Sequence, residues 1–314
     1  MTLGRDIPLR IRAIEALSPS LKRIAFVAAD GNPLPGSRPG AHIALTVPGI
    51  DGAHRNSYSL VGAHQDRTTY EVIVRRVAQS RGGSAQVHEA LRVGDVLSAS
   101  PPTSQFNLQN KAKKHLLIGG GIGITPFLSF LPVLRERNLA VEMHHFVRPD
   151  EVTVFERLLL PHRMPTMRIH AGRAVGIEDI LKGQPLGTHL YICGPVGLMQ
   201  DVEAAAYRLG WPTSNIHQES FGASGGRPFI VELARSGRKL QVGENQSLLE
   251  ALEAAGLPVR SMCRGGACGE CLTQVLAGEP EHRDHFLTAA EKSNGDRIMP
   301  CVSRSISPLL TIDI

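Results

Sequence analysis

Four of the five cysteines in this chain lie close together near its C-terminal end, and their spacing restricts the fold more than any other feature. The spacing is C-x4-C-x2-C with a distant fourth member, formed by Cys263, Cys268, Cys271 and Cys301. This is the plant-type arrangement for a [2Fe–2S] cluster, in which four thiolates surround two irons. Gly265, Gly266 and Gly269 allow the backbone N–H groups of the loop to turn toward the sulfur atoms. The spacing therefore predicts a two-iron site held by these four cysteines.

Disulfides, a zinc site and plain buried cysteines are the alternatives. No export signal is visible in the opening sequence, so the expected compartment is the cytoplasm, where disulfides are rare. Zinc sites usually carry paired C-x2-C units, and only Cys268 and Cys271 have that spacing. Cys193 stands apart at the end of an apolar run, where a lone cysteine is more often a small buried side chain.

The length of 314 residues predicts two or three domains. Residues 1–110 contain short β-like runs separated by Gly, Pro, Asn and Asp, which favours an antiparallel barrel or sandwich. Residues 111–222 alternate apolar strands with helices, which predicts a parallel sheet. The segment GASGGRP (222–228) is typical of a linker, and residues 229–314 begin with a hairpin pattern around Ser236–Gly237 and a helix pattern from Leu248.

Two strand-to-helix turns in the middle segment suggest a dinucleotide site. The first is HLLIGGGIGITP (115–126) and the second is YICGP (191–195). Such turns bring backbone N–H groups and a helix start up to a pyrophosphate at the carboxyl ends of parallel strands. A tight connection without a ligand is the alternative for either turn alone.

In the N-terminal segment, two motifs could hold a phosphate and an aromatic ring. RNSYSL (55–60) offers a guanidinium, a phenol and hydroxyls, and RRVAQSRGGS (75–84) offers arginines beside two glycines and a serine. Arginines on a strand are usually a solvated face, so each motif is weak on its own.

Taken together, these motifs resemble the phthalate dioxygenase reductase family, including its vanillate demethylase reductase members, over nearly the whole chain. The resemblance rests on YSL (58–60), RGGS (81–84), GGGIGITP (119–126), CGP (193–195), ESFGA (219–223), CRGGACGEC (263–271) and CVSR (301–304). It implies a multidomain α/β and β protein: an N-terminal antiparallel FMN-binding β-barrel, a parallel-sheet NAD-binding αβ domain and a C-terminal β-grasp ferredoxin domain. The corresponding ranges are 1–110, 111–222 and 229–314.

The resemblance also implies roles for individual residues. FMN would be held by Arg55, Tyr58, Ser59, Leu60, Arg81, Gly82, Gly83 and Ser84, with Val74 and Arg75 lining its ring. Gly120, Gly121 and Gly123 would form the NAD pyrophosphate turn, and Gly194 would lie near the nicotinamide. Thr125, Cys193 and Phe221 would line the reacting rings. The wider superfamily often has arginine two places before the tyrosine; Asn56 occupies that place here.

The implied activity is that of a reductase component, which passes electrons from NADH through FMN to the cluster and on to a separate terminal oxygenase by transient contact. The loop from Met262 to Cys271, with Arg264 and Glu270, is the expected docking surface. A general flavin reductase or diaphorase and a nonenzymatic iron–sulfur module remain alternatives. NADH is favoured over NADPH by the resemblance alone, and Arg148 lies beside two acids where a 2′-phosphate would bind.

Membrane and nucleic-acid functions are not expected. Leu116 to Leu134 is 19 residues without a charge, but its four glycines and two prolines would break a lipid-exposed helix. The net charge of +5 is accompanied by no basic run. His144, His145, His282 and His285 show no metal-ligand spacing, so we expect ordinary surface or core histidines.

Overall fold

The computed structural model describes residues 6–49, 53–77, 83–173, 175–221, 226–244, 246–257, 259–266 and 268–314. By the density of internal contacts, the chain divides into two compact units, one ending at Ser220 and one beginning at Phe221. Within the described residues no helix is both long and apolar enough to cross a membrane.

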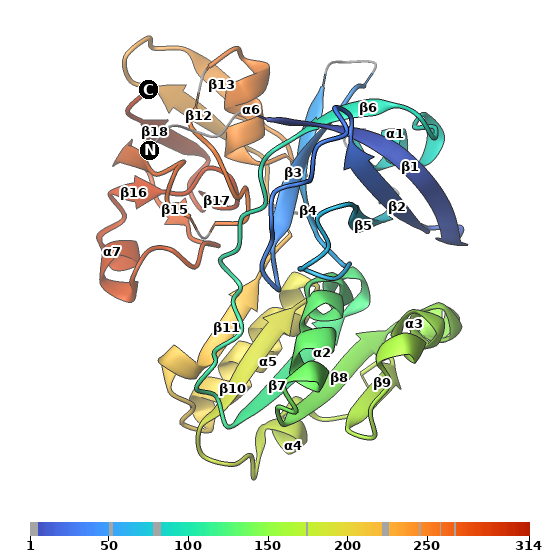
Figure 1. Cartoon of the computed structure of the whole chain (residues 1–314). Coiled ribbons are helices and arrows are strands. Elements are labelled where there is room, and N and C mark those ends of the chain that lie inside the picture. The colour runs from blue at the N-terminus through green and yellow to red at the C-terminus, as the bar shows by residue number, and fades with distance from the viewer. Residues whose placement is uncertain are drawn as a thin grey trace. The chain divides into compact units, whose positions relative to one another are not determined.

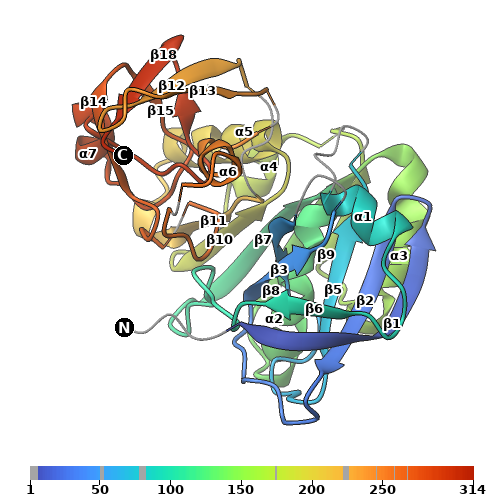
Figure 2. The same cartoon turned by 90° about the horizontal axis from the view of Figure 1, so that it is seen from above.

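The first unit starts with an antiparallel six-stranded sheet in the order β4-β3-β6-β1-β2-β5. Its strands are β1 (Ile7–Ser18), β2 (Leu21–Ala28), β3 (His42–Val47), β4 (His54–Ser59), β5 (Tyr70–Arg75) and β6 (Val96–Ala99). A bridge between Leu60 and Val72 links the ends of the two edge strands, so the sheet nearly closes into the predicted barrel. Alternate residues such as Leu9, Ile24 and Val72 fill its interior. Helix α1 (Gly83–Glu89) packs against β3, β4 and β5 (Figure 2).

The αβ half of this unit holds a fully parallel sheet in the order β11-β10-β7-β8-β9. Its strands are β7 (Lys114–Gly120), β8 (Val141–Val147), β9 (Met167–Ala171), β10 (Thr188–Cys193) and β11 (Ile216–Glu219). The longer helices are α2 (Thr125–Glu136), α3 (Val152–Leu159), α4 (Ile177–Leu181) and α5 (Val196–Arg208). Short 3-10 helices are η1 (Gly121–Ile124), η2 (Pro149–Glu151), η3 (Leu160–His162) and η4 (Thr213–Asn215).

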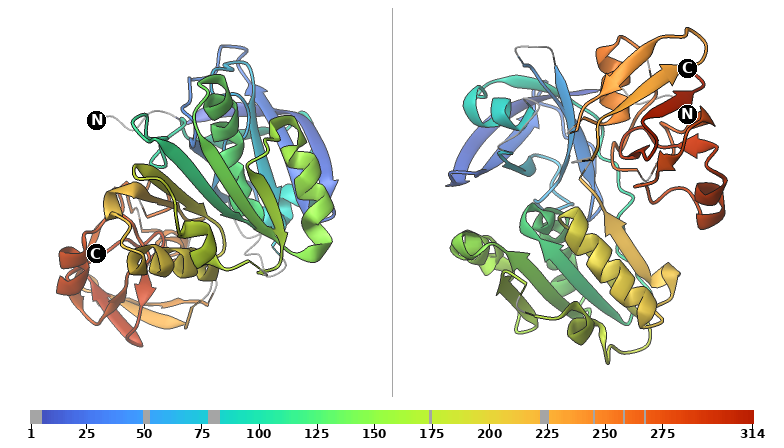
Figure 3. Two further views of the ribbon diagram at one scale, coloured as in Figure 1. Left: turned by 90° about the horizontal axis from the view of Figure 1, so that it is seen from below. Right: turned by 180° about the vertical axis from the view of Figure 1, so that it is seen from behind.

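Helices cover both faces of this sheet, as parallel strands require. Side chains of α2 and α3 pack on one face, and those of α4 and α5 pack on the other. Figures 1 and 3 show α5, in yellow, running alongside the strands of the sheet. The central strand β7 is buried from His115 onward, which explains its continuous apolar run. The α2 face also buries Leu21, Val61 and Ile73 of the barrel, so barrel and αβ domain share one core.

The second unit is a mixed five-stranded sheet in the order β13-β12-β18-β14-β16, with a separate pair β15-β17. Its elements are β12 (Phe229–Leu233), β13 (Lys239–Val242), α6 (Leu248–Ala254), β14 (Thr273–Ala277), β15 (Pro280–Glu281), α7 (Ala289–Asn294), β16 (Arg297–Ile298), β17 (Arg304–Ser305) and β18 (Leu309–Ile312). The predicted hairpin β12–β13 and the predicted helix α6 are both confirmed. Ser247 and Glu250 form a capping box at the start of α6.

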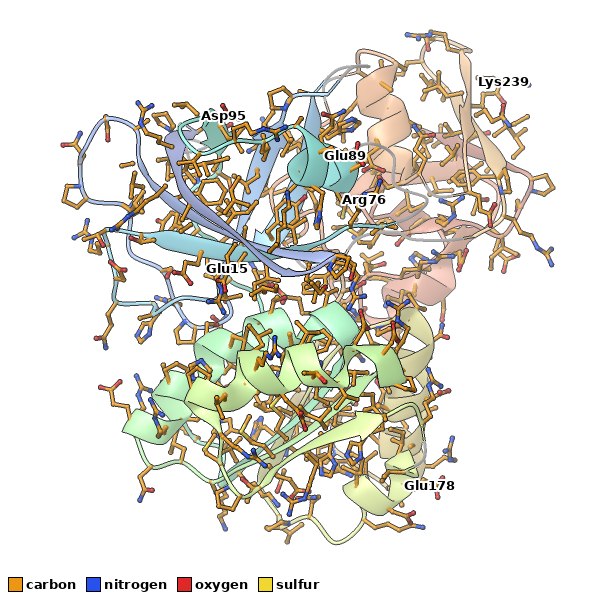
Figure 4. All side chains as sticks on the ribbon, turned by 90° about the vertical axis from the view of Figure 1, so that its right-hand side faces the viewer. Glu15, Arg76, Glu89, Asp95, Glu178 and Lys239 are labelled. Atoms are coloured by element: carbon orange, nitrogen blue, oxygen red, sulfur yellow. The ribbon has the colours of Figure 1, made fainter. Side chains whose placement is uncertain are left out.

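Surface ion pairs add little to either unit. Arg76, just after β5, contacts Glu89 at the end of α1 at 2.5 Å, and both side chains are about half exposed or more (Figure 4). Such a pair contributes about 0–1 kcal/mol. The fold therefore rests on its apolar cores, and the charged residues that matter are the buried ones described below.

Candidate functional site

The two predicted glycine turns meet at the carboxyl edge of the parallel sheet. They follow β7 and β10, which are neighbours in register from Thr188 and Lys114 to Cys193 and Gly119. A Cβ on Gly123 would overlap the carbonyl of Cys193, and one on Gly194 would lie 2.9 Å from the backbone nitrogen of Gly120. The close packing of the two turns against each other thus requires glycine at both positions, with or without a ligand. Their role in binding a pyrophosphate stays a prediction.

A polar cluster lies at the same edge, where the αβ domain meets the barrel. The Ser59 hydroxyl donates to Oε2 of Glu219 at 3.4 Å, and Nδ1 of His42 lies 3.8 Å from Oε1 of the same carboxylate. Cys193 pairs in register with Glu219 across β10 and β11. Burial and the nearby carboxylate raise the pKa of the Cys193 thiol well above its ordinary value. Cys193 is therefore a neutral thiol at this site.

Sequence reasoning missed two members of this cluster as site residues. Glu219 ends β11, next to the strand of Cys193, so the rule that sites gather at the carboxyl ends of parallel strands could have found it. His42 begins β3 of the barrel, 177 positions earlier in the sequence, and no local pattern marks it.

Strand β4 presents two different faces because neighbouring side chains alternate. On one face, the Tyr58 hydroxyl contacts the Asn56 amide, and a Cβ on Gly83 would overlap that same amide. Burial raises the pKa of Tyr58 to about 12. On the other face, Arg55 donates to both carboxylate oxygens of Asp6, at 2.8 and 3.0 Å. The expected phosphate ligand Arg55 is thus paired elsewhere, and Asn56 faces the start of α1.

Arg75 reaches from the barrel to the αβ domain. Its Nη1 donates to Oε1 of Glu151 at 2.5 Å, and Arg148 donates to the same oxygen at 3.1 Å. Burial alone would raise the pKa of Glu151, but the hydrogen bonds and positive charges of Arg75 and Arg148 together outweigh it, and the pKa lies below the ordinary value. The other terminal nitrogen of Arg75, Nη2, is buried, has no hydrogen-bond partner among the described residues and faces Gly121. An unsatisfied buried donor at the glycine turn fits a site that a ligand oxygen completes.

The remaining residues predicted to bind FMN or NADH divide into four groups. Val74 and Leu60 point into the barrel core, so their side chains pack there. Ser84 accepts a hydrogen bond from the backbone of Val77, and Thr125 donates to the carbonyl of Ile122 within the first glycine turn. Arg81 and Gly82 lie outside the described residues. Phe221, 41% exposed, belongs to the second unit, and its predicted contact with the flavin stays a prediction.

The four predicted cluster ligands come together in the second unit as two pairs of thiols. A hydrogen bond with Cys263 raises the pKa of Cys268, and a hydrogen bond from Cys301 lowers the pKa of Cys271. The backbone N–H of Gly265 donates to the Cys263 sulfur at 3.4 Å. No group of three or more His, Cys, Asp or Glu side chains in the described part of the chain has a single-ion arrangement. Two thiol pairs with backbone donors fit a two-iron cluster, in which each iron takes two cysteines.

Two buried charged residues fix the loop around these thiols. Arg264 has a left-handed backbone, with φ of 50°, and its guanidinium donates to both carboxylate oxygens of Glu253 on α6, at 2.7 Å each. It is only 9% exposed, so its side chain contributes little surface to the expected docking loop, which stays a prediction. Asp284 is buried and accepts from the backbone of Leu287 at 2.8 Å and from the Ser303 hydroxyl at 3.2 Å.

Arg304 fixes the entry to the second unit. It is fully buried and donates to the carbonyls of Gln246, Arg227 and Gly243. Its guanidinium also lies 5.3 Å from the ring centre of Phe229. The C-terminal part of the predicted linker, Gly226 and Arg227, is therefore anchored to the ferredoxin-like sheet.

Comparison with known proteins agrees with this division. Residues 231–305 match the model for 2Fe-2S iron-sulfur cluster binding domains, and residues 96–216 match that for the N-terminal domain of dimethylamine monooxygenase subunit DmmA-like proteins. The chain is 41% identical to a heme-dependent oxidative N-demethylase beta subunit from Ectopseudomonas mendocina, covering 98% of this chain and 99% of that protein. It is 34% identical to the phthalate dioxygenase reductase of Burkholderia cepacia, covering 98% and 97%. The chain belongs to the phthalate dioxygenase reductase family.

A solved structure supports the same assignment for the whole chain. The structure of a phthalate dioxygenase reductase, described as modular for electron transfer from pyridine nucleotides to [2Fe-2S], matches with a TM-score of 0.78 at 34% identity and covers 98% of each chain. The predicted family and three-part fold class are confirmed. The domain boundaries and the individual ligand roles stay predictions.

Proposed function

We infer that this chain is the reductase component of an oxygenase system, and that it carries electrons from NADH through FMN to its [2Fe–2S] cluster and then to a terminal oxygenase. The best support is that one chain combines a candidate cluster site with a barrel and a parallel-sheet domain. The cluster site consists of two pairs of thiols, Cys263 with Cys268 and Cys271 with Cys301. The general diaphorase and the nonenzymatic module would need no such combination. We propose the three domains at 1–110, 111–222 and 229–314.

NADH, FMN and the cluster differ in how many electrons they transfer at once, and these differences fit together. Nicotinamide gives up two electrons together, the cluster accepts one, and a flavin can take a pair and release it singly. The protein contributes placement and electrostatics. Cys193 and Glu219 provide a neutral thiol and a carboxylate at the sheet edge, and the unsatisfied Arg75 nitrogen provides a donor at the glycine turn.

For FMN, we propose that Tyr58, Ser59, Gly83 and Ser84 keep the roles that the family resemblance implies, and that Asn56 replaces Arg55 near the phosphate. Two contacts support this change. Asn56 faces Gly83 at the start of α1, and Arg55 is bound to Asp6 by two hydrogen bonds. We propose Gly120, Gly121, Gly123 and Gly194 for NADH, with Thr125 and Phe221 near the reacting rings.

We propose further that the partner is an oxygenase that removes methyl groups from nitrogen. The support is the 41% identity to an N-demethylase subunit, against 34% for phthalate dioxygenase reductase, together with the match of residues 96–216 to a dimethylamine monooxygenase subunit model. The contact is transient, since redox encounters usually bury less than about 1,200 Å². We place the protein in the cytoplasm, where disulfides are rare and cysteine thiolates stay available to bind iron.

The test is reconstitution with purified full-length protein carrying FMN and cluster. The protein is mixed with NADH, oxygen and either a heme N-demethylase catalytic subunit with a methylated amine or a Rieske oxygenase with its aromatic substrate. We expect formaldehyde from the amine in proportion to NADH consumed, and little turnover of the aromatic. Efficient turnover only with the Rieske oxygenase would overturn the partner class. No NADH oxidation with any acceptor would overturn the function itself.

A further inference from the structure

His42 connects the carboxylate at the sheet edge with the outside of the barrel. Its Nδ1 lies 3.8 Å from Oε1 of Glu219, and its Nε2 lies 3.1 Å from the hydroxyl of Thr103. The ring is held firmly, because the backbones of His42 and Thr103 exchange two hydrogen bonds, at 2.8 and 3.0 Å. His42 is only 7% exposed.

Polar groups continue beyond both sides of the His42 ring. On the inner side, Glu219 accepts from Ser59, which pairs in register with His42 across β3 and β4. On the outer side, Thr103 lines a surface hollow of about 210 Å³, together with Ser37, Arg38 and Pro102. Ser59, Glu219, His42 and Thr103 thus form one polar path from the candidate flavin site to an opening on the surface of the first unit.

The proposed electron transfer needs such a path, because it releases a proton. NADH yields NAD⁺, two electrons and one proton. Two cluster reductions, each by one electron, consume the two electrons and no proton. The balance is NADH plus two oxidised clusters giving NAD⁺, H⁺ and two reduced clusters. The proton starts at a buried site and must reach water.

We propose that His42 relays this proton from Glu219 to Thr103 and the surface hollow, and so acts as a positioning and proton-relay residue for the reductase. This proposal rests on the proposed function, since it assumes oxidation of NADH at the Ser59–Glu219 site. The 3.8 Å gap between Nδ1 and Glu219 needs a small movement or one bridging water.

The charges around His42 suit a relay. Burial lowers the pKa of His42 to about 4, so the ring is neutral near pH 7, with one nitrogen as donor and the other as acceptor. The Glu219 carboxylate faces Nδ1 of His42, and the neutral thiol of Cys193 lies near that carboxylate. A neutral imidazole between a carboxylate and a hydroxyl can take a proton at Nδ1 and give one at Nε2.

The main experiment compares His42→Phe with the unmodified full-length protein and with His64→Phe, a partly exposed histidine on the same barrel. Each is assayed with NADH and ferricyanide, a one-electron acceptor, while a pH dye follows proton release. We expect His42→Phe to lower steady-state turnover and proton release about tenfold or more, with a larger solvent isotope effect. The first bleaching of flavin by NADH under anaerobic conditions should stay within about twofold, because hydride transfer does not need the relay.

A second variant separates a relay from mere packing. His42→Ala leaves space beside the hollow, so added imidazole should restore much of its turnover and should not help His42→Phe.

Histidine ¹⁵N spectra of the flavin-free protein give a readout independent of activity: the Nε2 signal of His42 should shift in Thr103→Val.

The outcomes are distinct. Unchanged turnover and proton release in His42→Phe, or slowed turnover of His42→Ala without imidazole rescue, would overturn the relay. Failure of the unmodified protein to oxidise NADH would instead overturn the proposed function.

Discussion

The cluster site and the candidate flavin–nicotinamide site are built in opposite ways. Three of the four cluster cysteines lie within nine residues, and the loop between them is fixed by nearby partners such as Glu253, eleven residues before Arg264. The other site joins residues far apart in sequence: Arg75 and Glu151 are 76 positions apart, and Ser59 and Glu219 are 160. A local site is specified by spacing, whereas a distributed one depends on how two domains pack. Variants at the two sites should therefore differ in how far their effects spread.

The largest effect is expected from the distant cluster ligand. Cys301→Ser removes the hydrogen-bonded partner of Cys271 and the fourth thiolate, so the cluster should be lost. NADH–ferricyanide activity through the flavin should stay within about twofold, because the first unit keeps its own core. Iron analysis and the visible spectrum measure the first half, and ferricyanide reduction the second. Normal iron content would remove Cys301 from the ligand set.

Next in size is the buried arginine that anchors the entry to the second unit. Arg304→Met removes a fully buried guanidinium and leaves three backbone carbonyls without their donor, and it should destabilise the cluster domain by about 3 kcal/mol. Urea unfolding followed by cluster absorbance measures this. Arg235→Met, which removes an exposed partner of Asp313, is the matched control and should leave the unfolding midpoint unchanged. Equal effects of the two variants would show that Arg304 is no anchor.

Glu151 tests the contact between barrel and αβ domain. Glu151→Gln weakens its bonds to Arg75 and Arg148 and should destabilise the first unit by about 2 kcal/mol. The pKa of Glu151 is depressed in the folded state, so its contribution is complete above the ordinary glutamate pKa of about 4.3 and is lost as pH falls through the folded value. The stability difference should therefore shrink below about pH 4. Glu89→Gln, on the exposed Arg76 pair, is the control; a difference that persists at low pH would contradict the ion pair as its source.

The smallest effect concerns the flavin phosphate. Asn56→Asp places a negative charge beside Gly83 and should weaken FMN binding about tenfold, or about 1.4 kcal/mol. Arg55→Gln should change FMN affinity by less than about twofold, because that guanidinium is bound to Asp6. Fluorescence titration of the flavin-free protein with FMN measures both. A greater loss in Arg55→Gln would restore Arg55 as the phosphate ligand.

Much of the fold was predictable from sequence because its signals are local. The cysteine spacing, the apolar run of β7 and the Ser236–Gly237 hairpin each identify their element within a few residues. The partners of Arg55, Arg75 and Arg264 were not predictable, because the sequence around an arginine does not show whether its guanidinium binds a phosphate or a carboxylate. Asp6, Glu151 and Glu253 decide which, and only packing reveals them. The same reason applies to Gly123. The sequence predicts that it lies in a pyrophosphate-binding turn, and only the packing shows that the Cys193 backbone is its close neighbour.

The order of electron flow is tested most directly by anaerobic titration of the purified full-length protein with NADH, followed in the visible spectrum. A flavin that takes two electrons and a cluster that takes one require about 1.5 NADH per chain for complete reduction. Rapid mixing should show flavin bleaching before the cluster, and Cys301→Ser should need about one NADH per chain. Cluster bleaching in protein that lacks flavin, at the rate of the complete protein, would contradict the path from NADH through FMN to [2Fe–2S].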